Sequence, residues 1–267
     1  MTTLDDVLTA ADTVSYIAQE VAHLPVLGWR NGNKQAKTAG FWYVKTDGVP
    51  EPTTDNWQES SVYDNETGYV ATTARLLPLM KRQQAFLESE DGYKTWLSEW
   101  RQGARIQTQI LCLVEGFGNE PIIVSLKGLA GKAFTMKGGI LDQHSRFVKA
   151  VNAETKRAFN QWAFWMPVSA LVDSAGKTVY QDTGFKSFIT PPMFVGYDPN
   201  NLKATILDRF VGKDVYEIAT ALYQQYHAEG WHTAKRGNHE PDPTTYAPVA
   251  TTADADGVFT IKIKEGS

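Results

Sequence analysis

The sequence contains one cysteine, Cys112, among its 267 residues. A single cysteine cannot form a disulfide within the chain or provide a zinc site made of several thiolates. Cys112 lies in an apolar stretch with the pattern of a strand, so we expect a small core residue and not a reactive thiol. The chain is long enough to bury a substantial core, which must therefore hold the fold.

Long apolar runs are also missing. No stretch approaches the roughly 20 apolar residues that cross a membrane, and the polar, acidic N-terminus is unlike a signal peptide. We therefore expect a soluble, cytoplasmic protein with no membrane partner. The formal net charge of −4 gives no overall attraction to nucleic acid, so any site for a polyanion must be a local patch.

The usual enzyme signatures are absent. The sequence has no Gly-x-Gly-x-x-Gly fingerprint and no Gly-x-Ser-x-Gly elbow, and Gly128-Leu-Ala-Gly-Lys132 lacks the glycine spacing and hydroxyl of a phosphate-binding loop. His227 and His232 are close in sequence, but their spacing places them on different helix faces. We therefore predict no cofactor, no metal and no catalytic residues; an enzyme whose site is assembled from dispersed residues is the least favoured alternative.

Residues 100–157 give the clearest prediction of secondary structure in the chain. Apolar residues alternate with others over 106–114, a Gly-rich turn follows, and 122–126 is rich in β-branched residues, which together predict a hairpin. The apolar period then becomes helical from about Ala130 to Val151, with Gly138-Gly139 as a break or a helix start.

Other elements follow from the same periodicities. Strands are expected at 41–45, 69–87, 160–168 and 257–264, with 177–180 pairing back on 160–168 as a hairpin and 186–190 extended up to Pro191-Pro192. Helices are expected at 93–100, 202–210 and 215–226, and a short helix or a helix-strand entry at 1–24. Pro78 within a strand implies an edge or a bulge. Residues 46–68 are expected to form a polar surface loop pinned by Trp57.

These elements predict an α+β fold that is mainly antiparallel β. We expect an OB-like curved sheet or barrel with a crossing helix and C-terminal helices. Residues 1–232 would form one domain with helical additions at both ends. Residues 233–267, which are rich in Pro, Thr, Asp and Ala, would form an extended tail with a short terminal strand.

Basic residues gather locally in this acidic chain. Residues 127–157 hold seven Lys and Arg against Asp142 and Glu154, a local net charge of +5, and 29–45 hold four Lys and Arg and no acid. Aromatic residues lie between these cations. Alternation places Trp42 and Tyr43 on opposite faces of their strand, and likewise Phe164 and Trp165, so each pair should expose one ring.

Aromatic rings beside cations on a curved sheet are typical of sequence-tolerant sites for single strands, where each base stacks with roughly 1 to 3 kcal/mol. A packed core is the alternative interpretation of every ring. The stacking candidates are Trp29, Trp42, Tyr43, Trp162 and Trp165. The candidate phosphate contacts are Arg30, Lys34, Lys37, Lys45, Arg75, Lys81, Arg82, Lys132 and Lys137.

The layout of the hairpin 106–126, the helix 130–151 and the returning hairpin 162–190 resembles the strand and helix order of an oligonucleotide-binding (OB) barrel. The insertions and C-terminal helices are similar in scale to phage-type single-stranded DNA-binding proteins. The resemblance implies single-stranded DNA, or RNA, as the partner, a role in DNA replication or recombination, and a homo-oligomer as a further expectation. The sequence departs from such proteins in ending on Ile261-Lys-Ile-Lys-Glu-Gly-Ser267 and not on an acidic tail. The alternative function is a structural or assembly protein whose sheet edges and aromatic surface pack against copies of itself.

Overall fold

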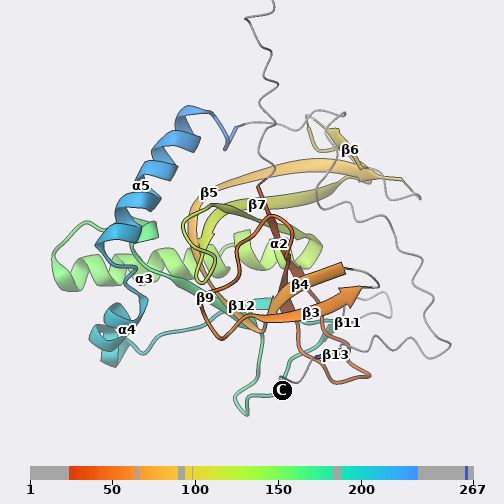
Figure 1. Ribbon diagram of the computed structural model, residues 1–267, viewed down its shortest axis with the longest axis horizontal. Coiled ribbons are helices and arrows are strands. Elements are labelled where there is room, and N and C mark those ends of the chain that lie inside the picture. The colour runs from red at the N-terminus through yellow and green to blue at the C-terminus, as the bar shows by residue number, and fades with distance from the viewer. Residues whose placement is uncertain are drawn as a thin grey trace, which may run out of the picture.

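The computed structural model describes residues 24–63, 66–89, 94–97, 99–182 and 188–233, together with the backbone of 262 and 263. The predicted helix at 1–24 and most of the predicted tail lie outside these ranges. An 11-stranded sheet dominates the fold, with its strands in the order β12-β9-β5-β7-β8-β1-β2-β4-β3-β13 and with β6 beside β5 (Figure 1). The pairing of β1 with β8 is parallel and every other described pairing is antiparallel, which confirms the mainly antiparallel α+β class.

The strands have the following bounds: β1 Val26–Arg30, β2 Phe41–Lys45, β3 Gln58–Tyr63, β4 Glu66–Ala71, β5 Thr73–Glu88, β6 Lys94–Leu97, β7 Arg105–Val114, β8 Ile122–Lys127, β9 Met166–Ala170, β10 Gln181–Asp182, β11 Phe188–Ile189, β12 Pro192–Phe194 and β13 Lys262–Ile263. The helices are α2 Gly128–Thr135, α3 Ile140–Thr155, α4 Leu202–Arg209 and α5 Lys213–Ala228, with 3₁₀ turns at Gln161–Ala163 and Pro199–Asn201. No helix among the described residues is long and apolar enough to cross a membrane.

The sheet is not closed into a barrel, so the predicted barrel is not confirmed. Its path of paired strands runs from β12 to β13 without returning. Where the two halves of the curled sheet approach each other, side chains link them in place of a backbone ladder: the indole N–H of Trp42 on β2 donates to the carbonyl of Val168 on β9 at 3.0 Å. This hydrogen bond joins two strands that do not pair in the sheet.

The predicted hairpin is confirmed as β7 and β8, and β5 pairs along the other side of β7. The register of β5 against β7 shifts between Pro78 and Met80, which is the bulge that the proline implied. Alternate residues supply two cores. Leu76, Ile110 and Val124 face an inner core with Phe134 and Phe147, the latter from α2 and α3. On the other face, Leu77, Leu111 and Ile123 form an outer core under α5 and Trp231.

The helical predictions over 130–151, 202–210 and 215–226 are confirmed, the first as two helices separated at Gly138-Gly139. Gly138 has φ +77 and Gly230, just beyond α5, has φ +71, conformations that favour glycine. In Figure 1, α3 crosses beside the sheet, α4 and α5 lie at one side, and the long ribbon of β5 and β7 extends away from them toward β6.

Several local predictions were wrong. The loop expected at 46–68 is confirmed only for residues 46–57, because β3 and the start of β4 follow and form a hairpin of polar residues near the sheet edge. The helix expected at 93–100 is the strand β6, in which Trp96 packs on Phe86 of β5 (ring centroids 5.5 Å apart). The strand expected at 160–168 begins as a 3₁₀ turn and becomes extended only from Met166.

The predictions for Trp57 and for the terminal strand agree with the structure. Trp57 does pin its segment, because its indole N–H donates to the carbonyl of Glu115 at 3.1 Å. The hairpin expected across the turn 173–176 is present only as a bridge between Val172 and Thr178, because β9 pairs with β5 and β12 instead. Pro192 begins β12 and does not end a strand. Within the predicted tail, Lys262–Ile263 pair with β3, in agreement with a terminal strand.

Candidate nucleic-acid interface

The β1–β2 loop and the segment that leads into β12 meet beside the Trp29 ring, where Thr190 links them by two hydrogen bonds. The carbonyl of Thr190 accepts the indole N–H of Trp29 at 2.8 Å, and its hydroxyl accepts the backbone N–H of Gly32 at 2.6 Å. Gly40 packs into the same junction, where a Cβ atom would lie 2.3 Å from the Trp29 ring and 2.5 Å from the Thr190 hydroxyl. The β1–β2 loop is thereby held against the segment that leads into β12.

Two exposed lysines, the exposed ring of Phe188 and the half-buried ring of Tyr180 lie around this junction. The ammonium of Lys34 lies 3.5 Å from the ring centroid of Phe188, whose side chain remains 38% exposed. The hydroxyl of Tyr180 donates to the carbonyl of Thr38 at 3.0 Å, which ties the second loop to the first. Lys37 is exposed and adopts a left-handed backbone conformation. We call Lys34, Lys37, Tyr180 and Phe188 the loop site.

The loop is ordered by its own side chains. The Asn33 carboxamide oxygen accepts the backbone N–H groups of Gln35 (2.8 Å) and Ala36 (3.1 Å), and the Thr38 hydroxyl accepts that of Asn33 (2.7 Å). Such local bonds fix the loop conformation before a ligand arrives. The loop site has two cations, Lys34 and Lys37, and Asp182, the cross-strand partner of Phe188, is an acidic neighbour.

Three further lysines form a second basic group, the α2 cluster, made of Lys81, Lys132 and Lys137. All three are exposed. The carboxamide of Gln83, two residues after Lys81 on the same face of β5, donates to the hydroxyl of Thr135 on α2 at 3.5 Å. The helix α2 also contacts β12, which begins two residues after Thr190, so the α2 cluster and the loop site lie on adjoining elements.

The tryptophans and tyrosine predicted near this junction are packed inside the protein. Trp29 is 9%, Trp42 0% and Tyr43 1% exposed. The rings of Trp29 and Trp42 meet edge to face at 5.1 Å, and Trp42 meets Phe134 of α2 at 6.1 Å. The prediction that Trp42 or Tyr43 faces solvent was therefore wrong.

The reason is that β2 is covered on both of its faces. On the face opposite Trp42, the Tyr43 ring lies against the backbone of Gly68, where a Cβ atom would be 2.2 Å from it, and the Arg30 guanidinium lies 5.6 Å from its centroid. Alternation along a strand separates two faces, but it does not say whether either face is open.

The candidates Trp162 and Trp165 are partly buried on the outer face of the sheet. Trp162 stacks on Tyr223 of α5 (ring centroids 4.4 Å apart, interplanar angle 24°), and its indole N–H donates to the hydroxyl of Thr220 at 3.0 Å. Trp165 packs against the outer core, while Phe164 is fully buried. Helix α5 thus occupies the ring face that Trp162 would offer to a base.

Comparison of the chain with protein-family models, with curated proteins and with solved structures gives no match.

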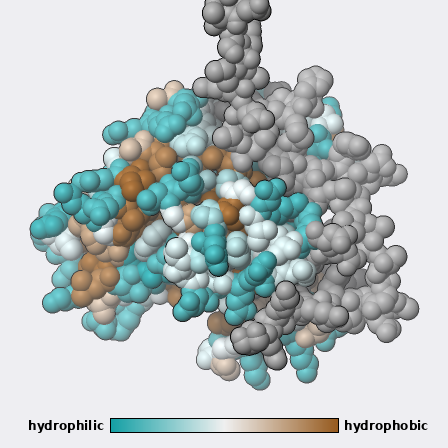
Figure 2. Space-filling model, viewed as in Figure 1, coloured by the Kyte–Doolittle hydropathy of each residue, from teal (hydrophilic) through white to brown (hydrophobic). Residues whose placement is uncertain are grey.

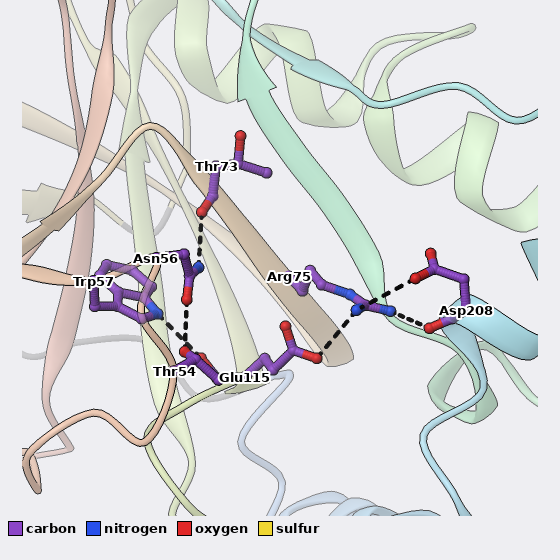
Figure 3. A network of polar contacts seen from close by, with 7 residues as sticks. All are labelled: Thr54, Asn56, Trp57, Thr73, Arg75, Glu115 and Asp208. Atoms are coloured by element: carbon purple, nitrogen blue, oxygen red, sulfur yellow. Dashed lines mark hydrogen bonds and ion pairs between the residues drawn. The ribbon is translucent and has the colours of Figure 1, made fainter.

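Arg75 is held in a structural network and not in the loop site (Figure 3). One guanidinium nitrogen lies 3.3 Å from the Glu115 carboxylate and 3.7 Å from that of Asp208, and another donates to the Asp208 carbonyl. Burial raises the pKa of Glu115 above its ordinary value. The charge of Arg75 opposes this shift and that of Asp208 adds to it. Thr54 and Asn56 join the same region to β5 through the Thr73 carbonyl (Figure 3). Arg75 therefore connects β5, the β7–β8 turn and α4.

Two other predicted cations are also engaged. Lys45 pairs with Glu66 across β2 and β4 at 2.8 Å. Arg82 donates to the Gln109 carboxamide at 2.8 Å, and its guanidinium lies 4.4 Å from the ring centroid of Trp231. The structure therefore brings together Trp29, Lys34 and Lys37 in one place and the α2 cluster in another. It separates Lys45, Arg75, Arg82, Trp162 and Trp165 from them, and it places Arg30 beside Tyr43, on the opposite face of its strand from Trp29.

Sequence reasoning missed Phe188, Tyr180 and Thr190. Phe188 and Thr190 belong to a segment expected to be extended, which gave no sign of exposure or of contact with the β1–β2 loop. Gly32 and Thr190 are 158 residues apart, so only the topology of the sheet brings them together.

Within the ranges that the structure describes, no group of three or more His, Cys, Asp or Glu side chains could hold a metal ion. The rings of His227 and His232 stack on each other at 4.6 Å. His144 is buried between Phe147 and Phe194, its Nε2 lies 2.9 Å from the Gln161 carbonyl, and its pKa is lowered by burial to about 4.

Proposed function

We propose that this protein binds single-stranded nucleic acid, with single-stranded DNA in replication or recombination as the favoured case, through the loop site and the α2 cluster. The observation that carries the proposal is the ammonium of Lys34 placed 3.5 Å over the exposed ring of Phe188, on two loops that Thr190 locks together. A nucleotide needs the same two partners: a ring on which its base stacks and a cation for its phosphate.

The α2 cluster supplies a path for the neighbouring phosphates. A strand leaving Phe188 would pass β12 and reach α2, where Lys132 and Lys137 are exposed, with Lys81 beyond them on β5. Each phosphate neutralised releases counterions, so binding should weaken as salt rises. The chain as a whole is acidic, which makes these local cations the ones that would attract a polyanion.

The OB-like interpretation belongs to this proposal. The helices α2 and α3 come between β8 and β9, the position that the resemblance expects, and loops from separate strand pairs gather at one end of a curved antiparallel sheet. Oligonucleotides bind to sheet faces and loops in OB-folds. The open path of the sheet is a departure from that family.

The stacking role moves from the predicted rings to Phe188, because Trp29, Trp42 and Tyr43 are buried and α5 covers Trp162. Binding should therefore be followed on the oligonucleotide and not on tryptophan emission. In an anisotropy titration with labelled oligo-dT and with duplex of equal length, we expect tighter binding of oligo-dT. With the five lysines of the loop site and the α2 cluster engaged, the slope of log K against log salt should approach about −3.5.

Matched variants assign the contacts. Phe188→Ala should weaken oligo-dT binding by roughly 1 to 3 kcal/mol at every salt concentration, whereas Lys34→Ala should reduce the salt slope by about 0.7. The controls are Phe210→Ala, a ring of similar exposure on another surface, and Lys213→Ala, an exposed lysine of α5. Equal affinity for duplex and single strand, or wild-type affinity in both loop variants, would contradict the proposal.

An assembly protein is the second candidate. The observation that favours it is the exposed apolar surface of α4, where Leu207 is 73% exposed.

A further inference from the structure

The outward face of α4 is apolar at its centre and charged at its ends. Leu202 and Ile206 pack toward the inner core, and the Arg209 guanidinium donates to the carbonyls of Val195 (2.8 Å) and Gly196 (2.7 Å), which fixes the helix on the protein. The exposed residues of the helix are Lys203, Ala204, Leu207 and Asp208.

Large apolar side chains are exposed on this face and next to it. Leu207 is the most exposed large apolar side chain among the described residues. Phe210, which follows the helix, is 42% exposed, and Val195, whose carbonyl accepts from Arg209, is 36% exposed. Figure 2 shows apolar side chains, in brown, over the region of α4 and α5. An apolar centre with a charged rim is typical of a protein interface.

We propose that this face binds the same face of a second copy of the chain, with the two α4 helices antiparallel about a two-fold axis. If the axis passes midway between Ala204 and Leu207, each Leu207 meets the second copy's Ala204. The small side chain leaves room for the large one, so the helices can approach closely. The same alignment places each Lys203 opposite the second copy's Asp208.

The charges and sizes of the exposed α4 residues favour a second copy of the chain as the partner of this face. Lys203 and Asp208 are equally distant from the proposed axis and carry opposite charges, so the face is complementary to itself, and the symmetry makes each contact twice. Asp208 is 66% exposed beside Arg75 and retains access to a partner. An eight-residue helix is only about 12 Å long, so we expect a small interface and a dimer that dissociates at low micromolar concentration.

Sedimentation equilibrium of the full chain over a concentration series tests the proposal. The wild type should pass from monomer to dimer as its concentration rises. Leu207→Asp and Ala204→Glu should each leave it monomeric throughout, with unchanged circular dichroism because both positions are exposed. Met136→Asp, at a 58% exposed methionine beyond α2, is the control and should dimerise as the wild type does.

A mixing experiment tests the alignment itself. Lys203→Glu and Asp208→Lys should each weaken self-association, because like charges then face each other, whereas an equimolar mixture of the two variants should dimerise again. Asp208→Lys also changes the surroundings of Arg75, so its folding is checked by thermal melting. A wild type that is monomeric at all concentrations, a dimer that survives Leu207→Asp, or a mixture no more associated than its components would overturn the proposal.

Discussion

Buried His144 should make the fold sensitive to mild acid. Its side chain is fully buried, and burial, opposed by the hydrogen bond to the Gln161 carbonyl and reinforced by the nearby Arg209, lowers its pKa from 6.5 to about 4. In the unfolded chain the imidazole takes up a proton as the pH falls below about 6.5. In the folded protein it stays neutral until the pH approaches 4.

The unfolded state therefore binds more protons between these two values, and stability is lost as the pH falls through that window. The difference between the two titrations amounts to about 2 kcal/mol between pH 7 and pH 5, and to about 3 kcal/mol at pH 4. Protonation in the folded state would place a charge beside the buried Arg209, among the rings of Phe147 and Phe194.

Urea unfolding of the wild type and of His144→Gln at pH 7, 6 and 5 measures this effect. Glutamine can place an amide N–H near the position of Nε2 and donate to the Gln161 carbonyl, but it does not titrate. The wild type should lose about 2 kcal/mol more than the variant between pH 7 and pH 5. His227→Gln, at an exposed histidine, should follow the wild type. Parallel pH profiles for the wild type and His144→Gln would refute the reasoning.

Three other predictions follow from the packing. Gly40→Ala should cost roughly 1 to 3 kcal/mol in urea unfolding because its Cβ atom collides with Trp29 and Thr190, whereas Gly28→Ala, with nothing within 4 Å of its Cβ position, should be close to neutral. Arg75→Ala should lower the free energy of unfolding by roughly 1 to 3 kcal/mol, because it leaves Glu115 unpaired. The same variant should bind oligo-dT as the wild type does. A loss of affinity at unchanged stability would show that Arg75 belongs to the interface. Burial raises the pKa of the Cys112 thiol, so a thiol reagent should react with it only when urea unfolds the chain, and rapid labelling of the native protein would contradict its placement in the core.

Elements with a strong periodicity were predictable from the sequence. The β7–β8 hairpin, the bulge at Pro78 and the helix break at Gly138-Gly139 all depend on local patterns that tertiary structure did not override. The strand β3 carries polar residues because it lies near the sheet edge, so no alternation revealed it. Trp96 and Leu97 fit a helix and a strand equally well over so short a stretch, and pairing with β5 decided the outcome.

The candidate site was predictable only in its local half. The basic loop that holds Lys34 and Lys37 could be seen in the sequence. Its aromatic partner Phe188 could not, because it comes from a distant hairpin that the curled sheet brings alongside. The burial of Trp42 and Tyr43 depends on what covers each face of β2, which alternation along the strand does not encode.

Photo-cross-linking tests the central claim most directly. Oligo-dT carrying 5-iodouracil would be irradiated on the protein, and the cross-linked peptides identified by mass spectrometry. The account predicts cross-links to the peptides that contain Phe188 or Tyr180, lost on competition with unlabelled oligo-dT and reduced by Lys34→Ala. Cross-links confined to α4 and α5, or unaffected by competitor, would show that the loop site is not where a single strand binds.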